Sequence, residues 1–414
     1  MKEHIAAAWK LLQEIYSSGT YLDRVFDGES PSALTARLVN GVLEQDVKIS
    51  YILSRLIEKK PQRSVAVLLK IGVYALLNLD NVPDYAVVSE CVEVMKDAGK
   101  GGASGFVNAV LKRVSRREYS LPSTTDKNYL SVNFSKPQWF LDKMISEYGR
   151  ERTLSLLEEP EFDKVHLRVN GRISSYGAVK SVLDAHAQEN VRSAVGGIIT
   201  SLTPVVANLF NEGVVTYQSP SSVLAVDALS PHYSAKILDL CAAPGGKSVY
   251  ASELAREGEV VACDLHPHRV NLIKKYAARM KADNIRSVVA DATKFDPQFE
   301  DAFDAVIADV PCSCFGTYRR HPDVFLQRGE EAIKTLAATQ KKILRNAVRY
   351  LKKGGTLIYS TCTLFKEENE DNADYAASLG LTPEVMPISY RNDGRYKILP
   401  RGEWDGFFIA RFRK

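Results

Sequence analysis

A short segment, residues 237–247, constrains the fold of this chain more than any other. It reads Ile-Leu-Asp-Leu-Cys-Ala-Ala-Pro-Gly-Gly-Lys: an apolar run, an acidic residue, and a tight turn with Pro244, Gly245 and Gly246. An amphipathic stretch, 248–256, follows. This order of strand, loop and helix is typical of an open α/β sheet. Such sheets bind ligands at the carboxyl ends of their strands, where glycines let the backbone approach the ligand.

Three later apolar runs also end at a carboxylate. They are 259–263 before Asp264, 288–290 before Asp291, and 305–308 before Asp309. An acidic residue roughly 20 positions beyond the first strand typically holds ribose hydroxyls, which is the role expected for Asp264. Capping of the next helix is the alternative for any single aspartate, but it explains the whole series poorly. The strand ends therefore indicate one shared crevice.

The glycine pattern of the first loop limits which class of ligand it can bind. The loop lacks the G-x-G-x-x-G of dinucleotide dehydrogenases, which makes a dehydrogenase improbable. Lys247–Ser248 echoes the end of a phosphate-binding loop, but the first glycine of that motif is missing at the required spacing. A ligand with ribose and adenine but no pyrophosphate fits better. S-adenosylmethionine is the obvious candidate.

Composition places the chain among ordinary globular proteins. Its 414 residues predict two or three domains, and 45% hydrophobic with 25% charged residues are usual values. With no signal-like start and no apolar run of about 18 residues, a cytoplasmic protein without a membrane segment is expected. Six cysteines in so long a chain are expected to be reduced thiols rather than a disulfide framework. A net charge of +4 leaves nucleic-acid binding to local patches.

The first 120 or so residues show only helical periodicity. Apolar residues recur three and four apart, as in Ile5, Ala8, Trp9, Leu12 and Ile15. Breakers fall at 28–31, Pro61, Pro83 and 99–102. This predicts a small helical bundle that ends in a basic helix, 106–117. The basic residues of that helix, Lys112, Arg113, Arg116 and Arg117, either form a solvated face or bind phosphate.

From 121 to about 219 the pattern is mixed, with a short helix near 135–137 and strands at 165–169 and 214–217. Beyond 220, strands alternate with helices, which predicts a doubly wound parallel sheet. Its last strands are expected at 357–360, 383–387 and 407–412, the last two as an antiparallel edge pair. The predicted domains are 1–122 (all-helical), 123–218 (small α/β, connecting) and 219–414 (α/β).

Two cysteines fall at the ends of apolar strands that open on the same crevice. Cys312 follows the strand that ends at Asp309, and Cys362 ends the next strand, Ser360–Thr361–Cys362. A buried structural cysteine is the usual alternative, but loops at these strand ends face the ligand. A thiol beside a methyl donor suggests covalent activation of a pyrimidine. A thiolate that adds to carbon 6 of cytosine turns carbon 5 into a nucleophile for the sulfonium methyl group.

The neighbours of these thiols must assist this chemistry. A free cysteine with a pKa of about 8.5 is only a few per cent thiolate at neutral pH, so basic neighbours and the positive sulfonium are expected to favour ionisation. Asp309 is expected to bind ring nitrogen 3 and the exocyclic amine. To donate a proton it needs a raised pKa, which partial burial produces.

These motifs together resemble the bacterial 16S ribosomal RNA cytosine-C5 methyltransferase B family (Sun/Fmu type). The segments that carry the resemblance are 239–247, 309–313, 319–323, 360–362 with 367–369, and 405–408. The amino-terminal region is similar to the NusB antitermination fold, at 37–43, 69–79 with 82–84, and 106–111. The resemblance implies a Rossmann-like methyltransferase domain preceded by an all-α NusB-like domain and a small α/β connecting domain. It also implies S-adenosylmethionine as cofactor, small-subunit ribosomal RNA as partner, and a monomer.

The resemblance assigns roles to individual residues. In the RNA family the nucleophile is the cysteine of the Thr-Cys motif, here Cys362, and the Pro-Cys cysteine, Cys312, assists release of product; in DNA cytosine methyltransferases the Pro-Cys residue is the nucleophile. Asp309 would lie between cofactor and base, and Lys247 would contact the substrate or Asp309. The implied cofactor-binding residues are Cys241, Ala242, Ala243, Pro244, Gly245, Gly246, Lys247, Asp264, Arg269, Asp291 and Asp309.

One residue departs from the family pattern. Cys314 stands where the family usually has glycine. A metal site made of Cys312, Cys314 and His321 lacks a fourth ligand at a recognisable spacing, so no metal is expected.

Basic residues accompany the crevice. The helix expected at 334–353 carries several basic residues and no acidic one, and Lys341, Arg345 and Arg349 lie four apart on one face. A solvated face and an RNA-backbone track are both open. Tyr318 is expected to stack on a base, since the target cytosine must be unstacked to reach the thiol. The candidate RNA-binding residues are Lys112, Arg113, Arg116, Arg319, Arg320, Lys341, Arg345 and Arg349.

Two alternatives remain beside ribosomal RNA methylation. The first is the same chemistry on transfer RNA, against which the NusB-like region argues. The second is a non-catalytic RNA-binding or antitermination factor with a vestigial methyltransferase domain. The presence of Cys312, Cys362, Asp309 and Asp264 speaks against that alternative.

Overall fold

The computed structural model describes residues 1–18, 22, 31–160 and 162–414. These residues form two compact units, one of Met1–Leu157 with Arg320–Glu330 and one of Glu158–Arg319 with Glu331–Lys414. Segment 320–330 returns to the helical unit, where Asp323 Oδ2 accepts a hydrogen bond from Leu22 N at 3.0 Å and Phe325 packs on Phe140. The predicted limits at 122/123 and 218/219 do not coincide with the ends of these units, and the three-domain division stays a prediction.

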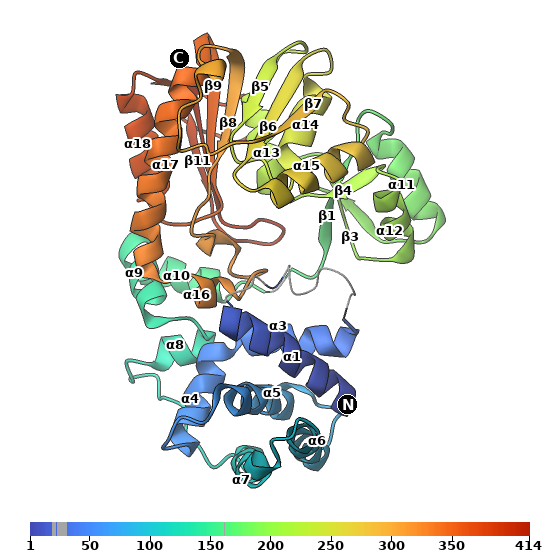
Figure 1. Ribbon diagram of the computed structural model, residues 1–414, viewed down its shortest axis with the longest axis vertical. Coiled ribbons are helices and arrows are strands. Elements are labelled where there is room, and N and C mark those ends of the chain that lie inside the picture. Colours follow the sequence, from blue (N-terminus) through green and yellow to red (C-terminus); the bar gives the residue numbers. More distant parts are fainter. Residues whose placement is uncertain (19–21, 23–30, 161) are drawn as a thin grey trace. The chain divides into compact units, whose positions relative to one another are not determined.

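The first unit is helical, as expected from the periodicity (Figure 1). Its helices are α1 (Lys2–Ser18), α3 (Ala33–Glu44), α4 (Asp46–Leu56), α5 (Arg63–Asn78), α6 (Asp84–Asp97), α7 (Ser104–Ser115), α8 (Tyr129–Phe134), α9 (Gln138–Tyr148), α10 (Arg150–Leu157) and α16 (Val324–Gln327). Helix α5 contacts α1, α3, α4, α6 and α7, and it is buried on almost every side. Gly41 of α3 permits this packing because a Cβ there would lie 2.0 Å from the Tyr74 ring.

A small antiparallel sheet opens the second unit. It holds β1 (Val165–Val169), β2 (Asn190–Arg192), β3 (Ile198–Thr200) and β4 (Val215–Tyr217) in the order β2-β3-β1-β4. Helices α11 (Tyr176–Ala185) and α12 (Pro204–Asn211) supply its core partners, with Leu167, Val179, Leu183 and Val206 buried together. This sheet confirms the small α/β part that the mixed pattern predicted.

The large sheet has eight strands, and most of them run in the order β10-β12-β9-β8-β5-β6-β7. Strands β5 (Lys236–Asp239), β6 (Glu259–Asp264), β7 (Ile285–Val289), β8 (Phe303–Asp309) and β9 (Leu351–Thr361) are parallel. Strands β10 (Thr382–Pro383), β11 (Arg395–Ile398) and β12 (Phe407–Arg413) add antiparallel pairs. The sheet is therefore mixed rather than wholly parallel.

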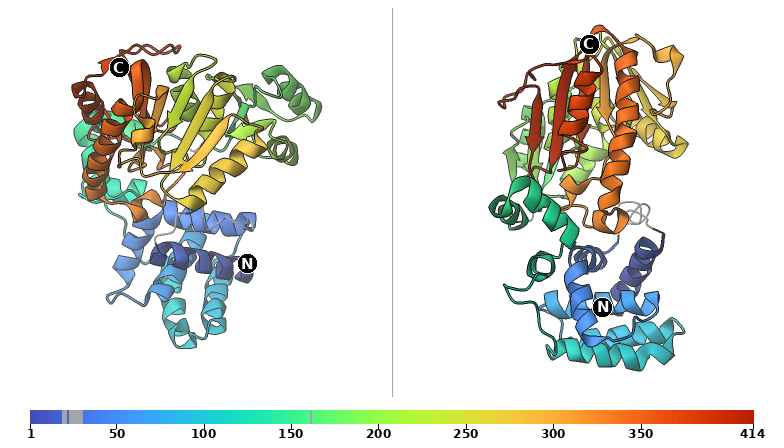
Figure 2. Two further views of the ribbon diagram at one scale, coloured as in Figure 1. Left: turned by 45° about the horizontal axis from the view of Figure 1, so that its top comes forward. Right: turned by 90° about the vertical axis from the view of Figure 1, so that its left-hand side faces the viewer.

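The carboxyl-terminal strands differ in detail from the expectation. The expected antiparallel pair at the sheet edge is present, because β10 is the terminal strand and pairs with β12. The difference lies in the length of β10, which reaches only Pro383 of the predicted 383–387. Strand β11 was not expected; it pairs with β12 along Arg395–Ile398. Figure 2 shows these red strands beside the orange strand β9.

Helices cover both faces of the large sheet. Helices α13 (Pro220–Leu229) and α14 (Gly246–Leu254) pack on one face through residues such as Ile237 and Ile307, and α15 (Pro267–Arg279) packs beside them. Helices α17 (Glu330–Tyr350) and α18 (Glu370–Ser378) pack on the other face through Leu238 and Val306. Alternate residues of each strand thus face opposite layers.

Helix α17 begins and ends earlier than the predicted 334–353. It starts with the acidic pair Glu330–Glu331, which suits a helix amino terminus. Lys352 and Lys353 belong to β9 instead, and Lys352 pairs with Asp304 at 2.7 Å. The stretch 334–353 has no acidic residue, as stated, but the helix begins earlier and so includes Glu330 and Glu331. None of the helices in the described ranges is long and apolar enough to cross a membrane.

Candidate active site

The buried carboxylate of Asp239, which is 1% exposed, holds the loop between β5 and α14. Its Oδ2 accepts a hydrogen bond from Ser248 Oγ at 2.6 Å, and its Oδ1 accepts one from Cys241 N at 3.4 Å. Burial raises the pKa of Asp239 to about 7. Gly245 has φ of 118°, a conformation that side chains disfavour, so the tight turn requires glycine there.

Asp264 and Arg269 hold the middle of the same loop. Asp264 Oδ2 accepts from Ala243 N at 3.3 Å, while Arg269 Nη2 donates to Ala243 O at 3.2 Å and its Nη1 lies 3.5 Å from Asp264. The Asp264 side chain is 2% exposed. The structure thus shows both residues bracing the loop, and their expected contact with the cofactor stays a prediction.

Asp291 follows β7 at the same end of the sheet. Its Oδ1 accepts from Thr293 Oγ1 at 2.6 Å and from Thr293 N at 3.0 Å, and hydrogen bonding by Thr293 lowers the pKa of Asp291. The carboxylate is therefore ionised at neutral pH. A cavity of about 260 Å³ opens here, lined by Leu240, Asp291, Ala292 and Phe295 among others.

Lys247 and Asp309 form an ion pair across the ends of α14 and β8. Lys247 Nζ lies 2.6 Å from Asp309 Oδ2 and 3.2 Å from Ser222 Oγ, and Asp309 Oδ1 accepts from Ser360 Oγ at 2.6 Å. Burial opposes the charge on Lys247, but the Asp309 carboxylate more than offsets it, so the pKa of Lys247 is raised. The ammonium therefore stays charged in the crevice. Its contact with Asp309 is one of the two contacts expected for Lys247, the other being the substrate.

The two strand-end cysteines lie side by side. Their Sγ atoms are 3.3 Å apart, and Cys362 N donates to Cys312 Sγ at 3.3 Å. Hydrogen bonding to Cys314 and burial raise the pKa of Cys312 well above the usual value, and hydrogen bonding to Cys312 and Cys314 together with burial does the same for Cys362. All six cysteines are reduced. The geometry therefore brings the two candidate reacting residues together but holds them protonated.

A buried polar network ties the two cysteine loops to each other. Ser313 Oγ, one residue beyond Cys312, lies 2.6 Å from Thr363 Oγ1, one residue beyond Cys362. Glu368 accepts from Ser313 N at 2.9 Å and from Ser313 Oγ at 2.5 Å. Burial raises the pKa of Glu368 to about 7. Each cysteine is thus followed by a residue that is fixed to the other loop.

Sequence reasoning gave no role to two members of this network, Glu368 and Gln340. Gln340 Nε2 donates to Pro311 O and to Glu368 Oε1, both at 2.9 Å. One signal for Gln340 was present in the sequence. It falls on the apolar face of α17 with Ala337 and Leu344, where an amide needs buried partners.

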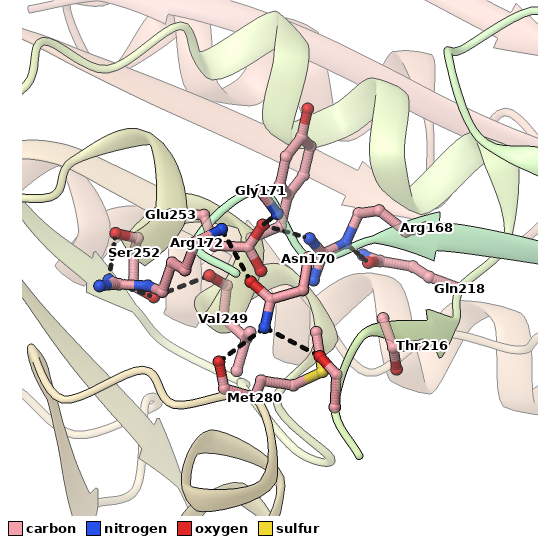
Figure 3. A network of polar contacts seen from close by, with 12 residues as sticks. Arg168, Asn170, Gly171, Arg172, Thr216, Gln218, Val249, Ser252, Glu253 and Met280 are labelled. Atoms are coloured by element: carbon pink, nitrogen blue, oxygen red, sulfur yellow. Dashed lines mark hydrogen bonds and ion pairs between the residues drawn. The ribbon is translucent and has the colours of Figure 1, made fainter. Parts of the chain in front are cut away.

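Polar contacts join the small sheet to helix α14, which follows the cofactor loop, and Figure 3 shows this network from close by. Arg168 of β1 pairs with Glu253 of α14 at 2.6 Å, with side-chain exposures of 5% and 4%, and its Nε donates to Gln218 Oε1 at 2.7 Å. Gln218 in turn lies under the loop, since its Nε2 is 3.6 Å from the position of a Cβ on Gly246. Asn170 Nδ2 donates to Met280 O at 2.9 Å and joins the small sheet to the end of α15. The small sheet and the large sheet are thereby one unit.

The candidate RNA-binding residues of α7 are exposed but partly engaged. Lys112 and Arg113 lie in the last turn of the helix, and Arg116 follows its end. Arg113 pairs with Glu118 at 3.2 Å and donates to Leu56 O at 3.0 Å, while Arg116 lies 3.8 Å from Glu118. Glu118 therefore moderates the positive charge of this patch.

The second group of basic residues is divided. Arg319 ends a segment of the second unit and donates to Pro160 O, whereas Arg320 begins the segment that belongs to the helical unit. Tyr318 is 4% exposed, so the expectation that its ring offers a stacking surface is wrong. Its neighbours bury the ring instead.

The basic face of α17 contacts its own surroundings. Arg345 Nη2 donates to Tyr375 OH at 3.1 Å, and Lys341 Nζ lies 5.5 Å from the centroid of that ring. Arg349 pairs with Glu300 at 2.8 Å. Lys341 and Arg345 therefore contact a neutral side chain, whereas Arg349 forms an ion pair with a carboxylate.

Three features define the class of this protein. The α/β sheet is mixed, with an antiparallel strand inserted near its end; a glycine turn follows the first parallel strand; and carboxylates stand at the following strand ends. These features are those of the Rossmann-like S-adenosylmethionine-dependent methyltransferases. Comparison with known proteins narrows the class. Residues 226–413 match the family model of the 16S rRNA methyltransferase RsmB/F, and residues 5–116 match that of the NusB family.

Relatives extend this match over the whole chain. The chain is 34% identical to the probable ribosomal RNA small subunit methyltransferase B of Bacillus subtilis, over 92% of this chain and 90% of that protein. It is 30% identical to the ribosomal RNA small subunit methyltransferase B of Photorhabdus laumondii, over 98% and 97%. The solved structure titled "Crystal Structure of PH0851" shares the fold, with a TM-score of 0.86 at 24% identity over 100% of this chain and 99% of that one.

The chain therefore belongs to the 16S rRNA methyltransferase RsmB/F family, and it carries a NusB-family domain at its amino-terminal end. It is an S-adenosylmethionine-dependent RNA methyltransferase. The resemblance drawn from the motifs, the fold class and the cofactor are confirmed. A non-catalytic antitermination factor is excluded by this membership.

Proposed function

We propose that this chain methylates carbon 5 of one unstacked cytosine in 16S ribosomal RNA through a covalent adduct with Cys362. The observation that carries the proposal is the juxtaposition of two strand-end thiols, whose sulfurs are 3.3 Å apart, at the sheet end that also holds the Lys247–Asp309 pair. A thiol nucleophile needs a second group that handles protons close by. The two cysteines supply both at one place.

The residues around the first loop fit S-adenosylmethionine by their chemistry. Asp264, Asp291 and Asp309 offer carboxylates at successive strand ends, and the cofactor carries a sulfonium, an ammonium and ribose hydroxyls that such groups bind. The loop 241–247 with Arg269 would hold the remainder. When bound, the cofactor supplies a methyl group on a positively charged sulfur.

The protein's own groups then act on the cytosine. Both thiols first release their protons to solvent. Cys362 as thiolate forms a bond to carbon 6, and the ring becomes an enamine whose carbon 5 accepts the methyl group. Cys312, as thiolate, then takes the proton that carbon 5 loses, and the sulfur–carbon 6 bond breaks with its electron pair returning to Cys362. The Lys247 ammonium and the Cys362 thiolate stabilise each other, which favours the ionised nucleophile.

Asp309 orients the base in this scheme. Its Oδ2 is paired with Lys247 and its Oδ1 accepts from Ser360, so the carboxyl group is fixed from two sides. A group fixed in this way can bind the ring nitrogen 3 and the exocyclic amine without rearrangement, which is how a pre-organised site lowers a barrier.

RNA would be held by exposed cations outside the crevice. The residues proposed for this are Lys112, Arg113, Arg116, Arg319, Arg320, Lys341, Arg345 and Arg349. Their contacts differ. Arg349 and Arg113 pair with glutamates, whereas Lys341 and Arg345 contact the neutral side chain of Tyr375. We further propose that the protein acts as a monomer in the cytoplasm.

Covalent trapping tests the assignment of the two cysteines. In the presence of 16S RNA and cofactor, Cys312→Ala is expected to accumulate a protein–RNA adduct that survives denaturing electrophoresis, because the adduct forms but is not resolved. Cys362→Ala is expected to give neither adduct nor product. Cys91→Ala, which removes a buried thiol of the helical unit, serves as the control and should behave like the wild type.

The opposite pattern would exchange the two roles. Methylation by both variants without any adduct would overturn the covalent mechanism. Mapping the methylated nucleotide by bisulfite sequencing then identifies the target cytosine.

A further inference from the structure

A third thiol lies at the reacting pair. Cys314 Sγ is 4.0 Å from Cys312 Sγ, and the ligand atoms of Cys312, Cys314 and Cys362 all lie within 4.8 Å of one another. Cys314 is not needed for the methylation chemistry proposed above, which uses two thiols. Its backbone has φ of 62°, in the left-handed region that favours glycine, so the chain holds a side chain where the fold prefers none.

The three sulfurs are spaced as ligands of one ion. A metal bound to thiolates at about 2.3 Å in a trigonal plane sets its sulfurs about 4.0 Å apart, which is 2.3 Å multiplied by the square root of three. The two measured separations are 4.0 Å and 3.3 Å. Lengthening the Cys312–Cys362 separation by 0.7 Å, through small rotations of the side chains, therefore brings it to the 4.0 Å of the triangle, with a fourth position left for water.

The chemistry of the three ligands favours a soft cation at this place, because thiolates select soft d¹⁰ ions. Cys312 is buried, while Cys314 and Cys362 are half-buried, which gives an ion access from the crevice. Lys247 opposes a cation, but its charge is already met by Asp309 at 2.6 Å. The carboxyl group of Glu368 also interacts with Cys312.

We propose that Cys312, Cys314 and Cys362 form a binding site for a thiophilic d¹⁰ metal ion, such as Zn²⁺ or Cu⁺, and that its occupation switches methylation off. Binding forms three metal–sulfur bonds and releases the thiol protons to solvent, with no change in oxidation state. The nucleophile is then a ligand and cannot add to cytosine. The inhibition rests on the proposed function of Cys362, whereas the metal site itself does not.

Direct titration with Cd²⁺ tests the site on the full-length, reduced and metal-stripped protein. A thiolate-to-metal charge-transfer band in the ultraviolet is expected to saturate at one equivalent. Cys314→Gly suits the left-handed backbone and removes the third ligand, so it should weaken Cd²⁺ binding at least about tenfold and keep the metal-free methylation rate. Cys91→Ala is the matched control, because it removes a thiol and leaves the triangle intact.

The same proteins are then assayed for RNA methylation with buffered Zn²⁺. The wild type and Cys91→Ala are expected to lose activity at a Zn²⁺ concentration at least tenfold lower than Cys314→Gly does. Equal Cd²⁺ affinity of Cys314→Gly and the wild type, or absence of the band, would overturn the metal site. A wild type that binds Cd²⁺ but methylates equally well when loaded would overturn the switch. Failure of the wild type to methylate at all would count against the proposed function, while the absorbance titration still decides on the site.

Discussion

The two sides of the crevice are held by different forces. On the cofactor side, charged groups brace the loop: Asp264 with Arg269, and Asp309 with Lys247. On the cysteine side, Ser313, Thr363 and Glu368 hold the loops through a buried hydrogen-bond network. Lys247 acts on both sides, since it pairs with Asp309 and interacts with Cys362.

The difference follows from what each side must do. Charged braces keep the cofactor loop in shape whether or not the cofactor is bound. The cysteine side keeps its thiols protonated until the cytosine arrives, because hydrogen bonding among the neighbouring thiols, together with burial, raises the pKa of Cys312 and Cys362. One side is therefore organised in advance for binding, and the other is organised for a delayed reaction.

The largest effect is expected where the two sides meet. Lys247→Met removes the cation that pairs with Asp309 and favours the Cys362 thiolate, so kcat should fall roughly 10³-fold. Arg269→Met, on the cofactor side alone, is the matched comparison and should weaken cofactor binding with a smaller effect on kcat. Steady-state methylation with isothermal titration of the cofactor separates the two. Equal kcat losses in both variants would break the distinction between the sides.

The support beneath the cofactor loop gives the next effect. Arg168→Met leaves Glu253 as a buried carboxylate without its partner, which should lower the free energy of unfolding by about 3 kcal/mol. Arg349→Met, which breaks an exposed pair with Glu300, should cost less than about 1 kcal/mol. Chemical denaturation of both variants measures the contrast. A small cost for Arg168→Met would mean that the small sheet does not brace the loop.

The network on the cysteine side predicts a dependence on pH. Burial raises the pKa of Glu368 from 4.5 to about 7, so between these values the folded state holds a proton that the unfolded state has lost. Stability conferred by this group is therefore full below pH 4.5 and declines as the pH rises through 7. Glu368→Gln should flatten that decline in thermal melts. Part of the decline should remain in this variant, because the pKa of Asp239 is also raised to about 7. An unchanged slope would show that Glu368 is ionised in the folded protein.

The smallest effect is expected outside the crevice. Changing Lys341 and Arg345 together to Ala should weaken RNA binding modestly and reduce the slope of log K against log salt by about one for each phosphate that is no longer bound. Arg349→Ala, whose charge is already met by Glu300, should change the slope less. Filter binding over a range of salt concentrations measures both. An unaltered slope in the double variant would mean that these residues form a solvated helix face and do not bind RNA phosphates.

Local patterns predicted the cofactor side well. The strand, turn and helix at 237–254 lie in one continuous segment, and the choice offered for Lys247 included Asp309, which it contacts. The cysteine network was less accessible because its bonds join residues far apart in the sequence, such as Ser313 and Glu368, which are 55 positions apart. The segment 367–369 was noted for its resemblance to the family, but its local pattern does not indicate which partners Glu368 meets.

Element limits failed where tertiary partners decide them. Lys352 continues a basic helical pattern, but its pairing with Asp304 places it on β9. Strand β11 is short and carries Arg395 and Lys397, so it looks like a loop until its pairing with β12 is known. The ring of Tyr318 looked available because its burial depends on surroundings that the sequence does not give.

Strand β12 has a consequence for synthesis. It pairs with β9 from Thr356 to Thr361, directly before Cys362, and its Arg411 is buried against the carbonyls of Ala228 and Leu229. A chain growing on the ribosome carries both cysteines well before residues 407–413 are added, and until then β9 offers an unpaired edge to other chains. A message cut short before codon 407 should therefore yield an aggregating product rather than a slow enzyme.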